Sequence, residues 1–164
     1  MCIRDRLKLL KEEKQLKLPV LQALACWGGE LPTMLLRDVL SEKSQPLLLA
    51  GLELLKFKVH QLSDVLLLDL VQKPLKDFRD PIVLSTIRVL QRRNSAAVNS
   101  QIAEIAKNGS EATARAALLA LSCIATPHSL ATLSNLLNEL PQGPLKEMAQ
   151  KQLQLQLQLQ LQYK

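Results

Sequence analysis

Aliphatic residues return at fixed offsets along most of this chain. Four small or aliphatic residues act as anchors, and each is followed by apolar residues 13, 16 and 17 positions later. The anchors are Ala23, Leu54, Val89 and Ala120, and the residues at the first offset are Leu36, Leu67, Ile102 and Leu133. Successive anchors lie 31, 35 and 31 residues apart. Apolar spacings of three and four place side chains on one helical face, so the pattern predicts helical repeats.

Each repeat is interrupted once, which indicates two helices per unit. Proline or capping residues open the first helices, at Pro19, Pro46, Pro81, Ser110 and Pro144. Breakers then precede the second helices, at Gly28-Gly29, His60-Gln61, Asn94-Ser95 and Thr126-Pro127-His128. One helical pair cannot bury its stripe alone, whereas stacked pairs share a continuous core. We therefore predict an all-α fold, an α-solenoid of antiparallel hairpins with about four repeats and partial units at each end.

The repeat pattern divides the chain into three parts: residues 1–17, a repeat array over 18–143, and residues 144–164. The first six residues resemble a translated sequencing adaptor, so we expect them not to be native, and residues 7–16 resemble the second helix of a truncated unit. Residues 144–153 match a further first helix. From Leu153 to Gln162 leucine and glutamine alternate. That period allows a frayed helix, an aggregation-prone strand or a low-complexity read-through.

Composition narrows the choice of fold and compartment. Aromatic residues make up 2% of the chain, with five glycines and eight prolines, which favours an aliphatic helical core over a turn-rich sandwich. The net charge of +6 permits an acidic partner without requiring one. Cys2, Cys26 and Cys123 have no metal-ligand or redox spacing, so we expect free core thiols in a reducing, cytoplasmic setting. No apolar run is long enough to span a bilayer.

The residues able to do chemistry are sparse. His60 and His128 both fall at predicted turns, and neither is followed by glutamate, so we expect hydrogen-bonded turn histidines rather than metal ligands. Gly28-Gly29 lacks the lysine and spacing of a phosphate loop. Trp27 is the sole indole, and we expect it to pack in the core. The sequence therefore predicts no enzyme activity, no metal and no cofactor.

Two segments resemble HEAT repeats of the short phycobilisome-lyase-like kind. One is Ala120-Leu121 through Ile124-Ala125-Thr126-Pro127 to Leu130, Leu133 and Leu136-Leu137, and the other is Ala23-Leu24 through Gly28-Gly29 to Leu36 and Leu40. The resemblance covers about residues 18–140, although Lys58 and Arg93 depart from the pattern. It implies a solenoid whose second helices line a concave face. HEAT arrays serve as scaffolds, adaptors, lyase subunits and, rarely, enzymes, so it implies little about function.

Polar residues follow the same repeat on the second helices. At offset 15 they are Asp38, Asp69, Glu104 and Asn135, and at offset 18 they are Ser41, Gln72, Lys107 and Asn138. We take Asp38, Asp69, Glu104, Asn135 and Lys107 as candidate partner-binding residues. Three acidic residues in line would grip a basic or amide-rich segment of a protein or peptide. The alternative is that these residues only solvate a face.

We therefore expect a non-enzymatic interaction or scaffold module that binds a protein or peptide along the concave face. A nucleic-acid-binding array is the first alternative, using basic residues assigned to the first helices and so to the convex side. Those residues are Lys56, Lys58, Arg88, Arg92, Arg93 and Arg115. An accessory fragment of a lyase-type enzyme is the second. Uncapped apolar ends would also allow self-association between chains.

Overall fold

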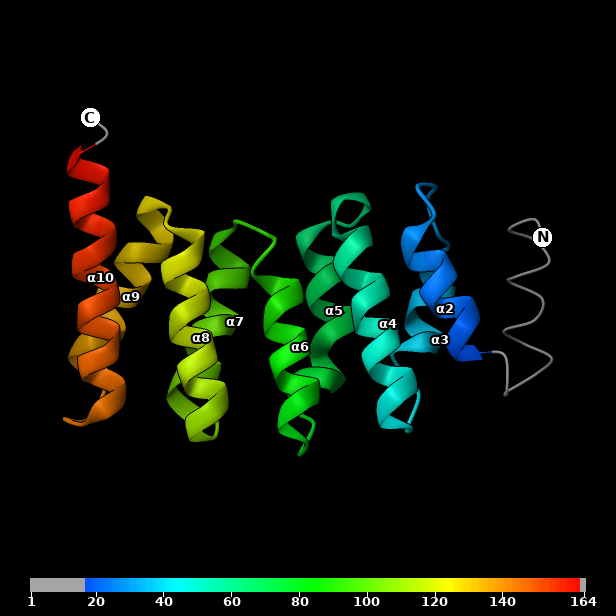
Figure 1. The fold of residues 1–164 in the computed structure, drawn as a ribbon, viewed down its shortest axis with the longest axis horizontal. Coiled ribbons are helices and arrows are strands. Elements are labelled where there is room, and N and C mark those ends of the chain that lie inside the picture. The colour runs from blue at the N-terminus through cyan, green and yellow to red at the C-terminus, as the bar shows by residue number, and fades with distance from the viewer. Residues whose placement is uncertain (1–16, 163–164) are drawn as a thin grey trace. The chain divides into compact units, whose positions relative to one another are not determined.

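The structure is a computed structural model that describes residues 17–162 (Figure 1). Over that range the chain forms nine α-helices and one 3-10 helix, with no strand, which confirms the predicted all-α class. The chain divides into two compact units, unit 1 over residues 1–89 and unit 2 over residues 90–164, and each is described by itself. The described residues do not include the first six, Cys2 among them, or the helix predicted over 7–16.

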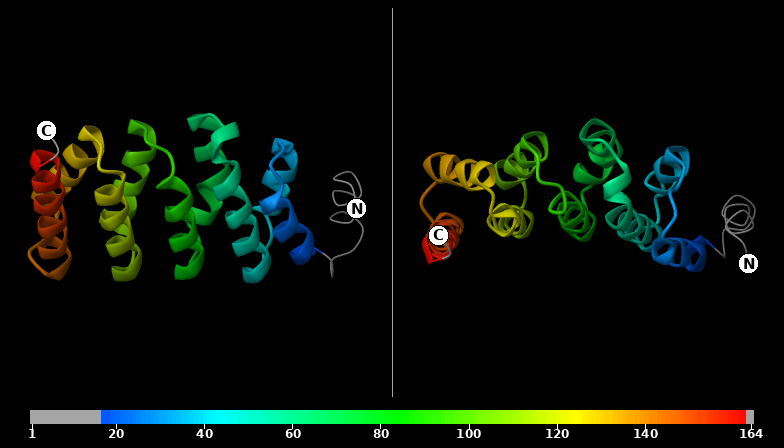
Figure 2. Two further views of the ribbon diagram at one scale, coloured as in Figure 1. Left: turned by 45° about the horizontal axis from the view of Figure 1, so that its top comes forward. Right: turned by 90° about the horizontal axis from the view of Figure 1, so that it is seen from above.

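Unit 1 begins with two helical pairs. Helix α2 (Lys17–Cys26) is followed by α3 (Thr33–Val39), and α4 (Gln45–Lys58) continues through the 3-10 turn η2 (Val59–Gln61) into α5 (Asp64–Leu75). Helix α6 (Asp80–Leu90) follows. The first helices α2 and α4 pack against each other, and α3 packs on α4. Viewed from above, α3 and α5 lie on the opposite side of the unit from α2 and α4 (Figure 2).

Unit 2 repeats this plan. Helices α7 (Ala96–Asn108) and α9 (Pro127–Glu139) pack together in one row, and α8 (Glu111–Ile124) and α10 (Pro144–Gln162) pack together in the other (Figures 1 and 2). Helix α8 also contacts both α7 and α9. Each helix in this unit therefore covers its sequence neighbour and the helix one repeat away.

Hydroxyl side chains cap four helices where the sequence places Ser or Thr at the turn. Ser63, Ser95 and Ser110 each accept a hydrogen bond at 3.3 Å from the backbone N–H three residues later. Thr126 and Ser129 form a reciprocal capping box at the start of α9. These bonds satisfy N–H groups that have no partner within the helix, so the predicted breakers also start the following helices.

The predicted apolar stripe forms the core. Leu36, Leu67, Ile102 and Leu133, which stand at the same offset in the four repeats, are at most 1% exposed. The first-helix anchors Leu54, Val89 and Ala120 are also buried, whereas Ala23 is half-buried. The four positions at the first offset are therefore equivalent in burial, whereas the anchors are not. Each such leucine or isoleucine contributes about 1.5–3 kcal/mol by leaving water.

Lys58 is a correction to the sequence analysis, which placed it on an exposed convex side. Its side chain is 2% exposed, and its ammonium donates hydrogen bonds to the carbonyls of Trp27 and, at 2.8 Å, Gly29. The ammonium also lies 5.6 Å from the centroid of the Trp27 ring, which is half-buried. The turn after α2 presents carbonyls that lack helical partners, and Lys58 at the end of α4 supplies their donor. This lysine thus joins the end of α4 to the turn after α2.

The Leu-Gln segment is helical through Gln162, so the strand alternative is wrong. Glutamines contact the neighbouring helix: Ser122 donates to Gln152 at 3.3 Å, and Gln160 donates to the carbonyl of Ala125 at 3.2 Å. Leu155, Leu157, Leu159 and Leu161 are all exposed, and so are Gln154, Gln158 and Gln160. A period of two on a helix places alternate residues about 200° apart, so the leucines spread over more than one face.

Several other local expectations also differ from the structure. Cys26 and Cys123 are exposed rather than core thiols, because Cys26 ends α2 and Cys123 lies on the outer face of α8. Arg92 and Arg93 follow the end of α6 at Leu90 and so do not belong to a first helix. Pro74 lies inside the last turn of α5, so the helix continues through this proline to Leu75. No described helix has the length and apolar character needed to cross a membrane.

Candidate partner-binding surface

All five candidate residues are exposed on second helices, but the structure gives them different neighbours. In unit 1, Asp38 lies on α3 and Asp69 on α5; in unit 2, Glu104 and Lys107 lie on α7 and Asn135 on α9. The five residues are therefore described separately for each unit, two in unit 1 and three in unit 2. Each unit carries its own polar surface on its second helices.

Ion pairs join the second helices within each unit. Arg37 on α3 contacts the Asp69 carboxylate at 3.0 Å, and Lys107 on α7 contacts Glu139 on α9 at 2.7 Å. In both pairs the two residues are 32 positions apart, which is one repeat. The hydrogen bond to Glu139 raises the pKa of Lys107 above its usual value, with a further contribution from the charge of Glu104. Exposed pairs of this kind add at most about 1 kcal/mol to stability.

These pairs change the expected charge of the stripe. Asp69 is balanced by Arg37, and Glu104 accepts a hydrogen bond from Asn108 at 3.2 Å. The expectation that three acidic residues bind a basic segment did not include these contacts, which already engage two of the three carboxylates. Arg37 and Glu139 were missed because only polar positions at two fixed offsets were compared. A search for opposite charges one repeat apart would have found them.

Two adjoining cavities open on the second-helix surface of unit 1. The smaller, about 230 Å³, lies between α3 and α5 and includes Asp69. The larger, about 360 Å³, extends from the end of α3 toward the turn between α5 and α6. Both are lined by Leu40, Ser41 and Lys73. Of the five candidate residues, these two cavities take in Asp69 alone.

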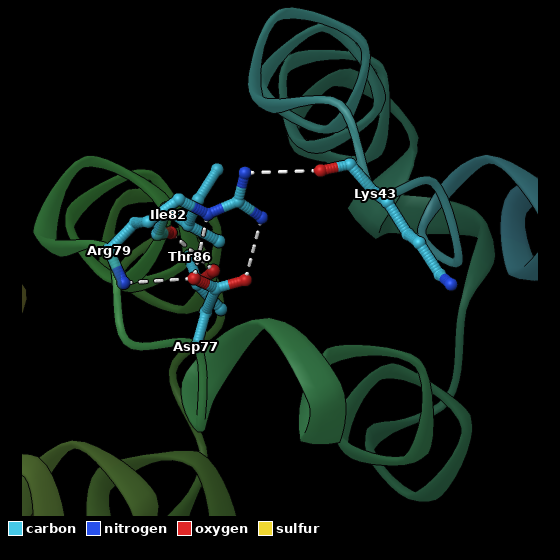
Figure 3. A network of polar contacts seen from close by, with 5 residues as sticks. All are labelled: Lys43, Asp77, Arg79, Ile82 and Thr86. Atoms are coloured by element: carbon cyan, nitrogen blue, oxygen red, sulfur yellow. Dashed lines mark hydrogen bonds and ion pairs between the residues drawn. The ribbon is translucent and has the colours of Figure 1, made fainter.

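An arginine holds the far edge of the larger cavity in place. The Arg79 guanidinium donates two hydrogen bonds to the Asp77 carboxylate, at 2.9 and 3.0 Å, and one to the carbonyl of Lys43 at 3.1 Å (Figure 3). The Arg79 hydrogen bonds lower the pKa of Asp77, and Asp77 raises the pKa of Arg79. The turn after α5 is thereby tied to the segment between α3 and α4. The shape of the cavity is fixed by charge-assisted hydrogen bonds.

The lining of the larger cavity is apolar below and charged at the rim. Leu40, Leu48 and Pro74 are buried at its base. Phe78 stands beside it with 90% of its surface exposed and the Arg79 guanidinium 5.4 Å from its ring centroid. An aromatic ring this exposed is uncommon in a chain with so few of them. An apolar base with a polar rim is the usual composition of a binding site.

Of the two histidines, His128 makes a side-chain contact between two helices. His128 lies in the first turn of α9, where its Nδ1 is 3.0 Å from the amide nitrogen of Asn99, a buried residue of α7. His60 lies in η2. Among residues 17–162, no three His, Cys, Asp or Glu side chains gather into a metal site.

No protein-family model matches this chain, and comparisons with curated proteins and with solved structures give no match either.

Proposed function

We propose that this chain is a HEAT-type α-solenoid segment. Its repeat spacing supports this, as do the polar contacts inside each unit. Side-chain hydrogen bonds between different repeats join residues 29 to 36 positions apart, from Asn99 with His128 to Arg79 with Lys43. Contacts that recur at one repeat length are what stacked helical pairs require, because each repeat touches only its neighbours.

The proposed activity is binding of a protein or peptide segment on the second-helix surface, without catalysis. The observation that carries it is the pair of adjoining cavities between α3, α5 and the start of α6. They form a groove on the surface that the repeat pattern singles out, and a salt bridge and an arginine network fix its two sides. A rigid groove loses little entropy when it binds an extended segment.

Peptide selection tests this proposal directly. Random 12-residue peptides displayed on phage are selected on the wild-type chain, and the enriched peptides are then assayed on two tryptophan variants. Ser41→Trp places an indole in the wall shared by both cavities. Ala112→Trp is the matched control, because Ala112 is exposed on α8 in unit 2.

The proposal predicts a set of peptides that lose binding in S41W and keep it in A112W, with unchanged helicity in both. If no enriched peptide distinguishes the two variants, the groove is not the binding surface. A salt series with duplex DNA addresses the nucleic-acid alternative. Tight DNA binding with a steep salt dependence would replace the peptide proposal, since such a slope counts released counterions.

A further inference from the structure

Building on the proposed function, we infer that the groove of unit 1 takes an acidic segment carrying an apolar side chain. The apolar side chain enters the larger cavity, and the flanking carboxylates contact Lys43 and Lys73. This reverses the sign that the acidic stripe predicted for the partner. In this groove, Lys43, Lys73 and Phe78 lie around the larger cavity, and Leu40, Leu48 and Pro74 form its base.

The charges around the groove carry the first part of the argument. Four basic and three acidic residues line the two cavities: Arg37, Lys43, Lys73 and Arg79 against Glu42, Asp69 and Asp77. Two of the acids are already bound to arginines, Asp69 to Arg37 at 3.0 Å and Asp77 to Arg79 at 2.9 Å. These two pairs cancel, which leaves Lys43 and Lys73 against Glu42. The groove therefore offers an excess of positive charge to a ligand.

The position of Lys73 carries the second part. Lys73 is exposed and lines both cavities. Within residues 17–162 it makes no ion pair. Lys43 has its carbonyl bound by Arg79, which fixes its backbone at the rim of the larger cavity while its side chain points away from Arg79 (Figure 3). A carboxylate between the two cavities would meet Lys73 without displacing an existing partner.

The cavity base carries the third part. A volume of about 360 Å³ is at the small end for ligand sites, which suits one side chain better than a cofactor. Leu40 and Leu48 are at most 5% exposed at this base, and Phe78 extends the apolar wall into solvent. An aliphatic or aromatic side chain would cover Phe78 as it enters. Apolar anchors surrounded by charge pairs are the usual arrangement of binding hot spots.

The test uses the peptides selected above that are sensitive to Ser41→Trp, with fluorescein labels and anisotropy titrations on the whole chain. We expect these peptides to be acidic and to contain a leucine, isoleucine or aromatic residue. The double variant K43Q/K73Q should bind them about fivefold to tenfold more weakly, the change expected for two exposed charge contacts. The single variant F78S should also weaken them. Replacing the apolar residue of the peptide with alanine should do the same.

Lys151→Gln is the control, because Lys151 is an exposed lysine on α10 in unit 2. It should leave the affinity within twofold of wild type. Circular dichroism melts must show that K43Q/K73Q and F78S remain folded, which is expected because the three replaced side chains are not core residues.

The outcomes separate this inference from the proposed function. If the S41W-sensitive peptides are basic, or if K43Q/K73Q binds them as tightly as wild type does, the acidic-segment inference is wrong while the groove stands as a binding surface. If no peptide is sensitive to S41W, the proposed function itself fails. Acidic, apolar peptides that are lost in K43Q/K73Q and kept in K151Q support both.

Discussion

Replacing Lys58 with methionine tests whether the buried ammonium holds α2 and α4 together. Methionine keeps a flexible apolar chain of similar length but removes the charge and all donors. Two carbonyls, of Trp27 and Gly29, lose a charge-assisted hydrogen bond, and Trp27 loses a cation above its ring. No other long-range contact depends on the ammonium among the residues described.

The magnitude follows from these contacts. Hydrogen bonds to charged groups contribute about 1.5–3 kcal/mol each, so two give about 3–6 kcal/mol. Trp27 and Gly29 are half-buried, so water can reach their carbonyls in part, which favours the lower end. We therefore expect K58M to lower the free energy of unfolding of unit 1 by about 3 kcal/mol.

The assay is urea unfolding followed by tryptophan fluorescence and, in parallel, by circular dichroism. Trp27 is the sole tryptophan of the chain and lies within the contact being tested, so its fluorescence reports on unit 1. Lys56→Met is the control: Lys56 stands two residues earlier on α4, and its half-buried side chain pairs with the exposed Glu53 at 2.7 Å. Its loss should cost less than about 1 kcal/mol.

A midpoint for K58M within experimental error of wild type would refute this reasoning. So would an equal loss in K56M, because that would assign the effect to charge on α4 in general rather than to the two carbonyls.

Three further predictions concern the backbone, the packing and the pH dependence. Ala125 ends α8 with φ 53°, in the left-handed region, so A125G should stabilise unit 2 by about 1 kcal/mol. The variant A131G, at an exposed position inside α9, should destabilise the unit by about the same amount. Calorimetric melting temperatures that shift in the same direction for both variants would contradict this. A Cβ added at Gly51 would overlap the Val39 side chain, so G51A should cost about 1–3 kcal/mol and the double variant G51A/V39A should recover part of that loss in a thermal melt. The pKa of Asp77 is lowered in the folded chain from 3.8, so the stabilising contribution of Asp77 is complete above that value and is lost as the pH falls through the folded pKa. The difference in urea midpoint between wild type and D77N should therefore be present at pH 7 and become smaller toward pH 3. A difference that stays constant with pH would show that the carboxylate charge is not involved.

The repeat positions could be predicted from sequence because their cause is local. Leu36, Leu67, Ile102 and Leu133 are buried by helical periodicity, and Ser110 and Thr126 cap helices through bonds to residues three positions away. Each of these features depends on a short stretch of chain. The sequence therefore predicted the all-α class and the burial of these four residues.

What the sequence missed depends on contacts one repeat away. Lysine is a residue type that normally lies on the surface, and the burial of Lys58 is explained only by its hydrogen bonds to the carbonyls of Trp27 and Gly29. Asp69 is likewise paired with Arg37, 32 residues earlier. A comparison of like offsets reveals what repeats share, but it does not reveal which residues of adjacent repeats complement each other. The net charge of the proposed binding surface depends on pairs of this second kind.

The hydrogen bonds of Gln152 and Gln160 have a consequence for changes in the length of α10. Gln160 is the last residue of α10 with a recorded hydrogen bond to the rest of unit 2. One Leu-Gln pair could therefore be deleted after it, or several added, and no recorded bond would change. Such changes leave both bonds in place, whereas insertion of a single residue before Gln152 would rotate every later side chain by about 100° and put a leucine where Gln160 now donates its bond.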